Sequence, residues 1–72
     1  MDDPYINLAN AIILQAVRDY RRALRQLKRN PQYTTAKHTI REVERFFHSK
    51  WFSFLTEINP DDLINRLVRA ES

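Results

Sequence analysis

The chain contains no glycine, and this absence limits the folds open to it more than any other feature of its sequence. Tight turns that need a positive φ must be made by asparagine instead, or avoided. β-Hairpins with two-residue turns are therefore disfavoured, and glycine-rich phosphate loops are excluded. Cysteine is also absent, which excludes disulfides and thiolate metal sites. The sequence predicts an all-α protein.

The chain of 72 residues is long enough for one small hydrophobic core, so we expect a single helical domain over residues 1–72. No stretch approaches the ~20 apolar residues of a membrane span, and no signal peptide is visible. The lack of cysteine fits a reducing compartment. We therefore expect a cytoplasmic protein that makes no membrane contact.

The first predicted helix lies between two proline signals. Asp3 can cap its start, and Pro4 can take the first helical position, where a missing N–H costs nothing. At its end, Asn30 tolerates the left-handed conformation that closes helices, and Pro31 forbids continuation. At about 1.5 Å per residue this helix is roughly 39 Å long. Its apolar stripe has spacings of three and four: Ile13, Val17, Tyr20, Leu24 and Leu27.

The N-terminal half of this helix is apolar on more than one face. From Leu8 to Val17 only Asn10 and Gln15 are polar. A helix of this kind needs cover on several sides. Either the rest of the chain wraps around it, or a second copy of the chain covers it. In the second case the self-association residues are Leu8, Ile12 and Ile13.

Three shorter helices are predicted to follow. The second starts at Thr34 or Thr35 as its cap and ends near residue 48. Ser49 can cap a third helix that ends near residue 55, and Asn59 can cap a fourth. The apolar stripes of the second and fourth helices are Ala36, Ile40, Val43 and Phe47, and Leu63, Ile64, Leu67 and Val68. We therefore expect a long N-terminal helix packed on a compact unit of two to three shorter helices.

All four phenylalanines and the single tryptophan lie within residues 46–54, in the run FFHSKWFSF. Aromatic side chains bury more area than any others. We therefore expect this run to form the centre of the core around Trp51, and Trp51→Ala to cost roughly 3–5 kcal/mol of stability. The alternative is an exposed platform on which single-stranded bases stack.

Positive charge is concentrated in the middle of the chain. The net charge is +3, yet residues 18–50 carry ten Lys or Arg residues against three acidic residues. Three interpretations stay open for the basic face of the first helix: a solvated surface, a contact with nucleic acid or nucleoprotein, and a contact with an acidic protein surface. Six basic residues share a sector of roughly 120° on this helix: Arg18, Arg21, Arg22, Arg25, Lys28 and Arg29.

The residue patterns of catalytic or metal sites are missing. His38 and His48 have no spacing typical of metal ligands. Glu44 and His48 are four residues apart, so we expect them to pair on a helix surface. Asp61 and Asp62 fit a helix start, where negative charge is favourable. We expect no catalytic residue, no metal and no cofactor, and therefore a protein that is not an enzyme.

The segments Ala11–Leu24 and Glu42–Phe52, with the Asn30-Pro31 break between them, resemble a family of small proteins encoded in prophages and integrative elements of Gram-positive bacteria. The resemblance covers roughly residues 8–67, and its most specific part is the Phe-Phe-x-Ser-x-Trp-Phe run. This chain departs from the family pattern at Asn59-Pro60, where relatives carry Asp-Gly. The resemblance implies a phage or mobile-element protein in a bacterial cytoplasm, and it implies no particular site residues.

Together these features lead us to expect a non-enzymatic accessory protein that binds nucleic acid or nucleoprotein through the basic helix face. Genes of this kind often encode regulators or inhibitors of host systems, so the first alternative is a protein-binding inhibitor or adaptor directed at a host protein. The second alternative is a small homodimer.

Overall fold

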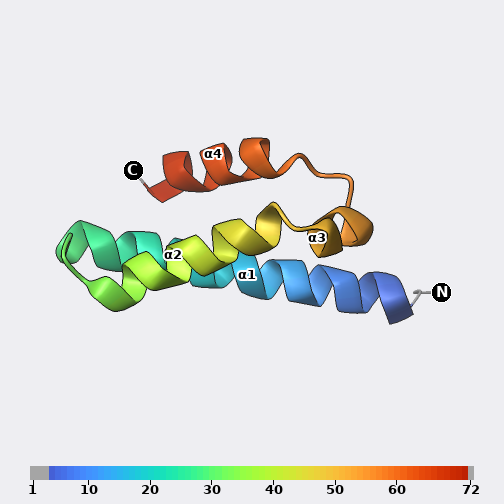
Figure 1. Ribbon diagram of the computed structural model, residues 1–72, viewed down its shortest axis with the longest axis horizontal. Helices are drawn as coiled ribbons and strands as arrows, with labels where there is room; N and C mark the ends of the chain where they lie inside the picture. Colours follow the sequence, from blue (N-terminus) through green and yellow to red (C-terminus); the bar gives the residue numbers. More distant parts are fainter. Residues whose placement is uncertain (1–3, 72) are drawn as a thin grey trace.

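The fold consists of four helices, as the computed structural model shows for residues 4–71, with side chains described from residue 7 to residue 71 (Figure 1). These are α1 (Pro4–Arg29), α2 (Thr34–Phe47), α3 (Lys50–Leu55) and α4 (Pro60–Glu71). No strand occurs among the described residues. The all-α prediction is confirmed, as is the prediction that a long N-terminal helix packs on shorter ones.

The helices form a slender bundle of 44 × 20 × 20 Å (Figure 1). α2 runs back along α1, the short α3 lies at the turn, and α4 returns in the direction of α1. α1 contacts all three of the others. α4 packs on the C-terminal half of α1, and α3 lies beside the N-terminal half (Figure 1).

α1 ends at the predicted place but not in the predicted conformation. No described residue has a positive φ, so Asn30 does not adopt the left-handed conformation. Instead, the Asn30 N–H donates to the Gln26 carbonyl at 2.9 Å. The Asn30 side-chain oxygen accepts from the Gln32 N–H at 3.2 Å, and its carbonyl accepts from Tyr33 N–H at 3.0 Å. Local hydrogen bonds therefore turn the chain before Pro31 could disrupt the helix. The predicted cap at Asp3 lies outside the described residues.

Two of the predicted caps are confirmed. The Ser49 hydroxyl accepts a hydrogen bond from the Phe52 N–H at the start of α3. The Asn59 side chain accepts from the N–H groups of Asp61 and Asp62, at 2.9 and 3.1 Å, at the start of α4. Each cap satisfies backbone donors that have no partner inside the helix.

The predicted cap of α2 is wrong. The cap is Tyr33, whose backbone is extended and whose side chain makes no capping hydrogen bond. The Tyr33 carbonyl already accepts from the Lys37 N–H at 3.2 Å, so both Thr34 and Thr35 belong to the first helical turn. Threonine is a common capping residue, but the hydrogen bond from the Lys37 N–H to the Tyr33 carbonyl starts this helix one residue earlier.

The core joins all four helices around Tyr20 of α1. Tyr20, Phe47 and Phe52 are the largest fully buried side chains, and Val43 and Leu67 complete the buried cluster. The rings of Tyr20 and Phe47 are 6.1 Å apart, and those of Phe47 and Phe52 are 5.3 Å apart and close to edge-on. Partly buried residues from the predicted stripes pack around this cluster: Ile13, Val17, Leu24, Ile40, Leu63 and Ile64.

The prediction that the core centres on Trp51 is wrong. Trp51 is 58% exposed and Phe54 is 82% exposed, whereas Phe47 and Phe52 are each 1% exposed. The reason lies in α3, which has only six residues, KWFSFL. Four of them are apolar and they point in several directions, so a helix this short cannot bury them all against one core. The cost of 3–5 kcal/mol expected for Trp51→Ala therefore belongs to Phe47 and Phe52.

The N-terminal half of α1 is only partly wrapped by its own chain. Ile13 and Val17 pack against the core cluster. By contrast, Leu8 is 59% exposed and Leu14 is 48% exposed. Intramolecular contacts therefore cover one side of this half and leave apolar surface on others. Within the described part of the chain, no helix has the length and apolar character needed to cross a membrane.

Candidate nucleic-acid interface

The six basic residues predicted to form one face of α1 are all exposed. Each of them has another member of the set three or four positions away. They therefore lie in adjacent rows on the side of α1 away from Tyr20 and the core. The structure divides them into residues that hold the bundle together and residues that make no ion pair.

Arg21 and Arg25 belong to the first group. Arg21 Nε lies 2.8 Å and Arg25 Nη1 lies 3.2 Å from the same oxygen, Oε1 of Glu71. The Glu71 side chain is only 10% exposed. The hydrogen bond from Arg21, and the positive charges of Arg25, Arg21 and Lys28, hold the pKa of Glu71 below its usual value. These two arginines therefore attach the C-terminal end of α4 to α1.

The second group contains Lys28 and three arginines, and we call these three the arginine row: Arg18, Arg22 and Arg29. None of the three forms an ion pair with any other described residue. Their spacings of four and seven place them on one line along α1, over a rise of roughly 16 Å. Asp19, the one acidic residue near this line in sequence, accepts a hydrogen bond from Gln15 at 2.9 Å. Arginine guanidinium groups match the geometry of phosphate oxygens, so an unpaired row of them suits a polyanion.

A second set of exposed basic residues lies on α2, and we did not single it out from the sequence. We call it the α2 basic row: Lys37, Arg41 and Arg45. Their spacing of four residues is the signal that could have revealed it. The neighbouring surface of α2 carries both signs of charge, because exposed Glu42 pairs with His38 at 3.0 Å. That mixture is typical of a solvated helix face.

The expected pairing of the Glu44 carboxylate with His48 is wrong. The Glu44 carboxylate points inward instead and accepts a hydrogen bond from the Tyr20 hydroxyl at 2.7 Å. Burial, and then this hydrogen bond to a negative charge, raise the pKa of Tyr20 well above its usual value. The hydroxyl therefore stays protonated, and the pair satisfies the polar end of a buried aromatic side chain.

His48 bonds to other groups at the junction of α2 and α4. Its Nδ1 lies 2.9 Å from the Glu44 backbone carbonyl, and its Nε2 lies 2.9 Å from Asp61 Oδ1. Both of these oxygens are acceptors, so both contacts are hydrogen bonds only when both ring nitrogens carry a proton, as in the imidazolium form. The hydrogen bond to Asp61, and then that to the Glu44 carbonyl, raise the pKa of His48. No group of three or more His, Asp or Glu side chains in the described part of the chain could hold a metal ion.

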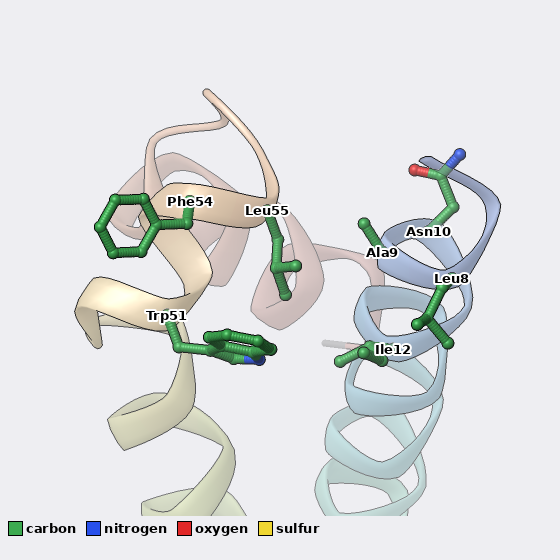
Figure 2. A pocket seen from close by; sticks show the side chains of 7 residues that line it. All are labelled: Leu8, Ala9, Asn10, Ile12, Trp51, Phe54 and Leu55. Atoms are coloured by element: carbon green, nitrogen blue, oxygen red, sulfur yellow. The ribbon is translucent and has the colours of Figure 1, made fainter. Parts of the chain in front are cut away.

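An open apolar groove separates α3 from the N-terminal end of α1 (Figure 2). Its volume is about 330 Å³. Trp51 and Leu55 reach into it from α3, and Leu8 and Ile12 line it from α1, while Phe54 at its rim points away from α1 (Figure 2). Of the residues predicted for self-association, Leu8 and Ile12 therefore meet here, and Ile13 packs on the core.

Family models, curated proteins and solved structures were each compared with the chain, and none of them matches it. The resemblance to small phage proteins therefore stays a prediction.

Proposed function

We propose that this protein is a non-enzymatic accessory protein that binds nucleic acid, free or in a nucleoprotein, through the outer face of α1. The observation that supports this proposal is the arginine row. Arg18, Arg22 and Arg29 stay exposed and make no ion pair within the described chain, although Glu71 and Asp19 lie on or beside the same helix. Unpaired arginines in a line are suited to phosphate groups along a backbone.

The expected binding is electrostatic and independent of base sequence. Phosphate contacts position a protein on nucleic acid but do not read bases. If the arginine row and Lys28 each neutralise one phosphate of a duplex, the slope of log affinity against log salt is roughly −4. Affinity then falls by about two orders of magnitude between 50 and 200 mM salt.

The resemblance to small phage proteins supplies the biological context of this proposal, a phage or mobile element in a bacterial cytoplasm. A second candidate function is a protein-binding inhibitor or adaptor directed at a host protein. It is favoured by one observation, the apolar groove beside Trp51, because large apolar side chains left exposed are typical of protein contacts.

Fluorescence anisotropy with labelled random duplex and single-stranded oligonucleotides tests the proposal. The test variant replaces the arginine row with glutamine, and the control variant replaces the α2 basic row with glutamine. Both variants lose three positive charges, so they share the same net charge. The substitutions are R18Q, R22Q and R29Q in the test variant, and K37Q, R41Q and R45Q in the control.

The salt slope of the test variant should fall in magnitude by about three, because each lost phosphate contact removes about one unit. The control should keep a slope near that of the natural protein. Equal weakening in both variants would mean that binding follows net charge and not the outer face of α1. No binding by the natural protein at 50 mM salt would refute the proposal and leave the protein-binding candidate.

A further inference from the structure

We propose that two copies of this chain associate through the apolar end of the bundle, with Phe54 of each copy entering the groove between α1 and α3 of the other. The inference does not depend on what the arginine row binds. It follows from the shape of the groove, the position of Phe54 and the uncharged lining of the groove.

The groove can accept an aromatic ring. It has a volume of about 330 Å³. Leu8 and Ile12 contribute an aliphatic wall from α1 opposite the Trp51 ring, and Leu55 adds an aliphatic surface on the α3 side (Figure 2). A cavity of roughly 150 Å³ with such walls is enough to bind benzene. The groove is open to solvent, so a side chain from another molecule can enter it without rearrangement of the bundle.

Phe54 is placed to fill such a groove, but not the one beside it. It is the most exposed large apolar side chain among the described residues, and its ring points away from α1 (Figure 2). The protruding ring and the hollow lie at the same end of the molecule, and in the proposed dimer a two-fold axis relates the copies so that each ring enters the hollow of the other. Such a self-complementary pairing is the usual form of a protein dimer.

The charge distribution favours a second copy over a charged partner. The sequence has no Asp, Glu, Lys or Arg between Asp3 and Arg18, or between Lys50 and Glu57. Those segments contain every residue that lines the groove. The groove itself is therefore uncharged, and the nearest charges on the α3 side are those of Lys50 and Glu57 at its edges.

The exposed area fits a weak dimer. With roughly 150–250 Å² for a whole aromatic side chain, Trp51 and Phe54 leave on the order of 300 Å² exposed at 58% and 82%. Leu8, 59% exposed, adds to this area on the other side of the groove. Each partner in a standard interface contributes about 800 Å². Because the available area is well below that contribution, we expect a weak, reversible dimer with a dissociation constant on the order of 10–100 μM.

Sedimentation equilibrium from 1 to 200 μM protein is the first test. The expected mass rises from 8.7 kDa at low concentration toward twice that value. Phe54→Ala should raise the dissociation constant about a hundredfold, since a symmetric dimer loses two aromatic anchors worth roughly tenfold each. Leu14→Ala is the matched control: Leu14 is an exposed apolar residue of α1 that does not line the groove, and its loss should leave the constant unchanged.

The geometry is tested by cross-linking, because the chain has no cysteine of its own. Phe54→Cys and Leu8→Cys variants are mixed and oxidised, with a short tag on one of them to distinguish their masses. The expected product is a disulfide between the two different variants. The Leu8→Cys variant alone should give little product.

Three results would overturn the proposal: a monomer at 200 μM, a dimer that Phe54→Ala leaves intact, or cross-linking of Leu8→Cys to itself as readily as to Phe54→Cys. A groove that instead receives a host protein would give the first of these results. Neither assay contains nucleic acid, so they are independent of whether the arginine row binds phosphate.

Discussion

The aromatic run divides into two pairs that have opposite environments. Phe47 and Phe52 are buried in the centre of the bundle, and their rings are in contact. Trp51 and Phe54 lie on the outside, at the edge of an open groove. All four residues come from eight consecutive positions, so closeness in sequence says nothing about which of them face inward. The orientation of α3 decides it.

The orientation of α3 follows from the break between α2 and α3. In an uninterrupted helix Phe47 and Trp51, four positions apart, would share one face. The chain leaves the helix at His48 and Ser49 and starts again at Lys50. The buried partner of Phe47 is therefore Phe52, and Trp51 reaches into the open groove instead of the core. A break of two residues thus separates aromatics that stabilise the fold from aromatics that are free to contact another molecule.

The sharpest test of this contrast, with the largest expected effect, compares Phe47→Ala with Trp51→Ala. Phe47→Ala removes a fully buried ring and should cost about 3–5 kcal/mol. Trp51→Ala removes a ring that is mostly in water, and should change the stability of the monomer by less than about 1 kcal/mol. Urea unfolding followed by circular dichroism, at a concentration below that of any self-association, measures both.

A loss of several kcal/mol from Trp51→Ala in the monomer would break the contrast, because it would place Trp51 in the core after all. Phe52→Ala serves as the second buried variant. If Phe47→Ala fails to fold, the milder Phe47→Leu still has to destabilise the protein more than Trp51→Ala does.

Tyr20→Phe sharpens the contrast by removing only the polar atom of the third buried aromatic residue. The Tyr20 hydroxyl donates to the partly buried Glu44 carboxylate at 2.7 Å. A hydrogen bond to a charged group is worth about 1.5–3 kcal/mol, so we expect a loss in that range. Tyr33→Phe is the control, because Tyr33 is exposed and its change should stay within about 0.5 kcal/mol. Equal effects in the two variants would mean that the hydroxyl of Tyr20 contributes nothing specific.

The sequence was a good guide to the inward faces of α1 and α2, whereas Val68, predicted to lie on the apolar stripe of α4, is 43% exposed. The stripes of α1 and α2 alternate with charged residues over several turns, and Tyr20, Val43 and Phe47 were correctly predicted to face inward. α3 has about one and a half turns and four apolar residues, so no periodicity distinguishes Phe52 from Trp51. Only packing against α1 and α2 resolves that ambiguity.

The candidate site was predictable to the same extent. The spacing of the basic residues in α1 placed all six on one exposed face, as observed. It could not reveal that Arg21 and Arg25 are bound to Glu71, because that residue is 46 or more positions away in sequence. Long-range ion pairs depend on how helices return to one another, and a helical wheel contains no such information.

Ser49→Ala tests the break between α2 and α3 and should lower the free energy of unfolding moderately. The Ser49 hydroxyl donates to the Phe46 carbonyl at 2.6 Å and accepts from the Phe52 N–H at 3.2 Å, so it connects the end of α2 to the start of α3. Its loss should cost about 1 kcal/mol, as for other helix caps. Ser53→Ala is the matched control, because its hydroxyl only donates to the Lys50 carbonyl within α3.

The same variant gives a second readout through the only tryptophan of the chain. If the cap holds α3 in its orientation, Ser49→Ala should change how readily a soluble quencher reaches Trp51, and Ser53→Ala should not. Loss of stability without any change in quenching would show that the cap stabilises α3 but does not set which aromatic residues face outward.

The smallest expected effect is the pH dependence of the contact between His48, at the break, and Asp61, at the start of α4. The pKa of His48 is raised in the folded protein, chiefly by its hydrogen bond to Asp61. A raised pKa means that the contact contributes its full stability below the unfolded-state pKa, about 6.5. That contribution is lost as pH rises through the higher folded-state value. Unfolding midpoints between pH 5 and pH 9 should therefore show a small decline above about pH 6.5.

Two variants test whether this decline comes from the contact. Asp61→Asn should flatten the decline, whereas Asp62→Asn should keep it. Both carboxylates lie in the first turn of α4 and favour its positive end equally, so they differ only in the contact with His48. If the two variants behave alike, the decline reflects the charge at the helix start and not the link between His48 and Asp61. The position of α4 beside the break would then depend on the apolar contacts of Leu63 and Ile64 with the core.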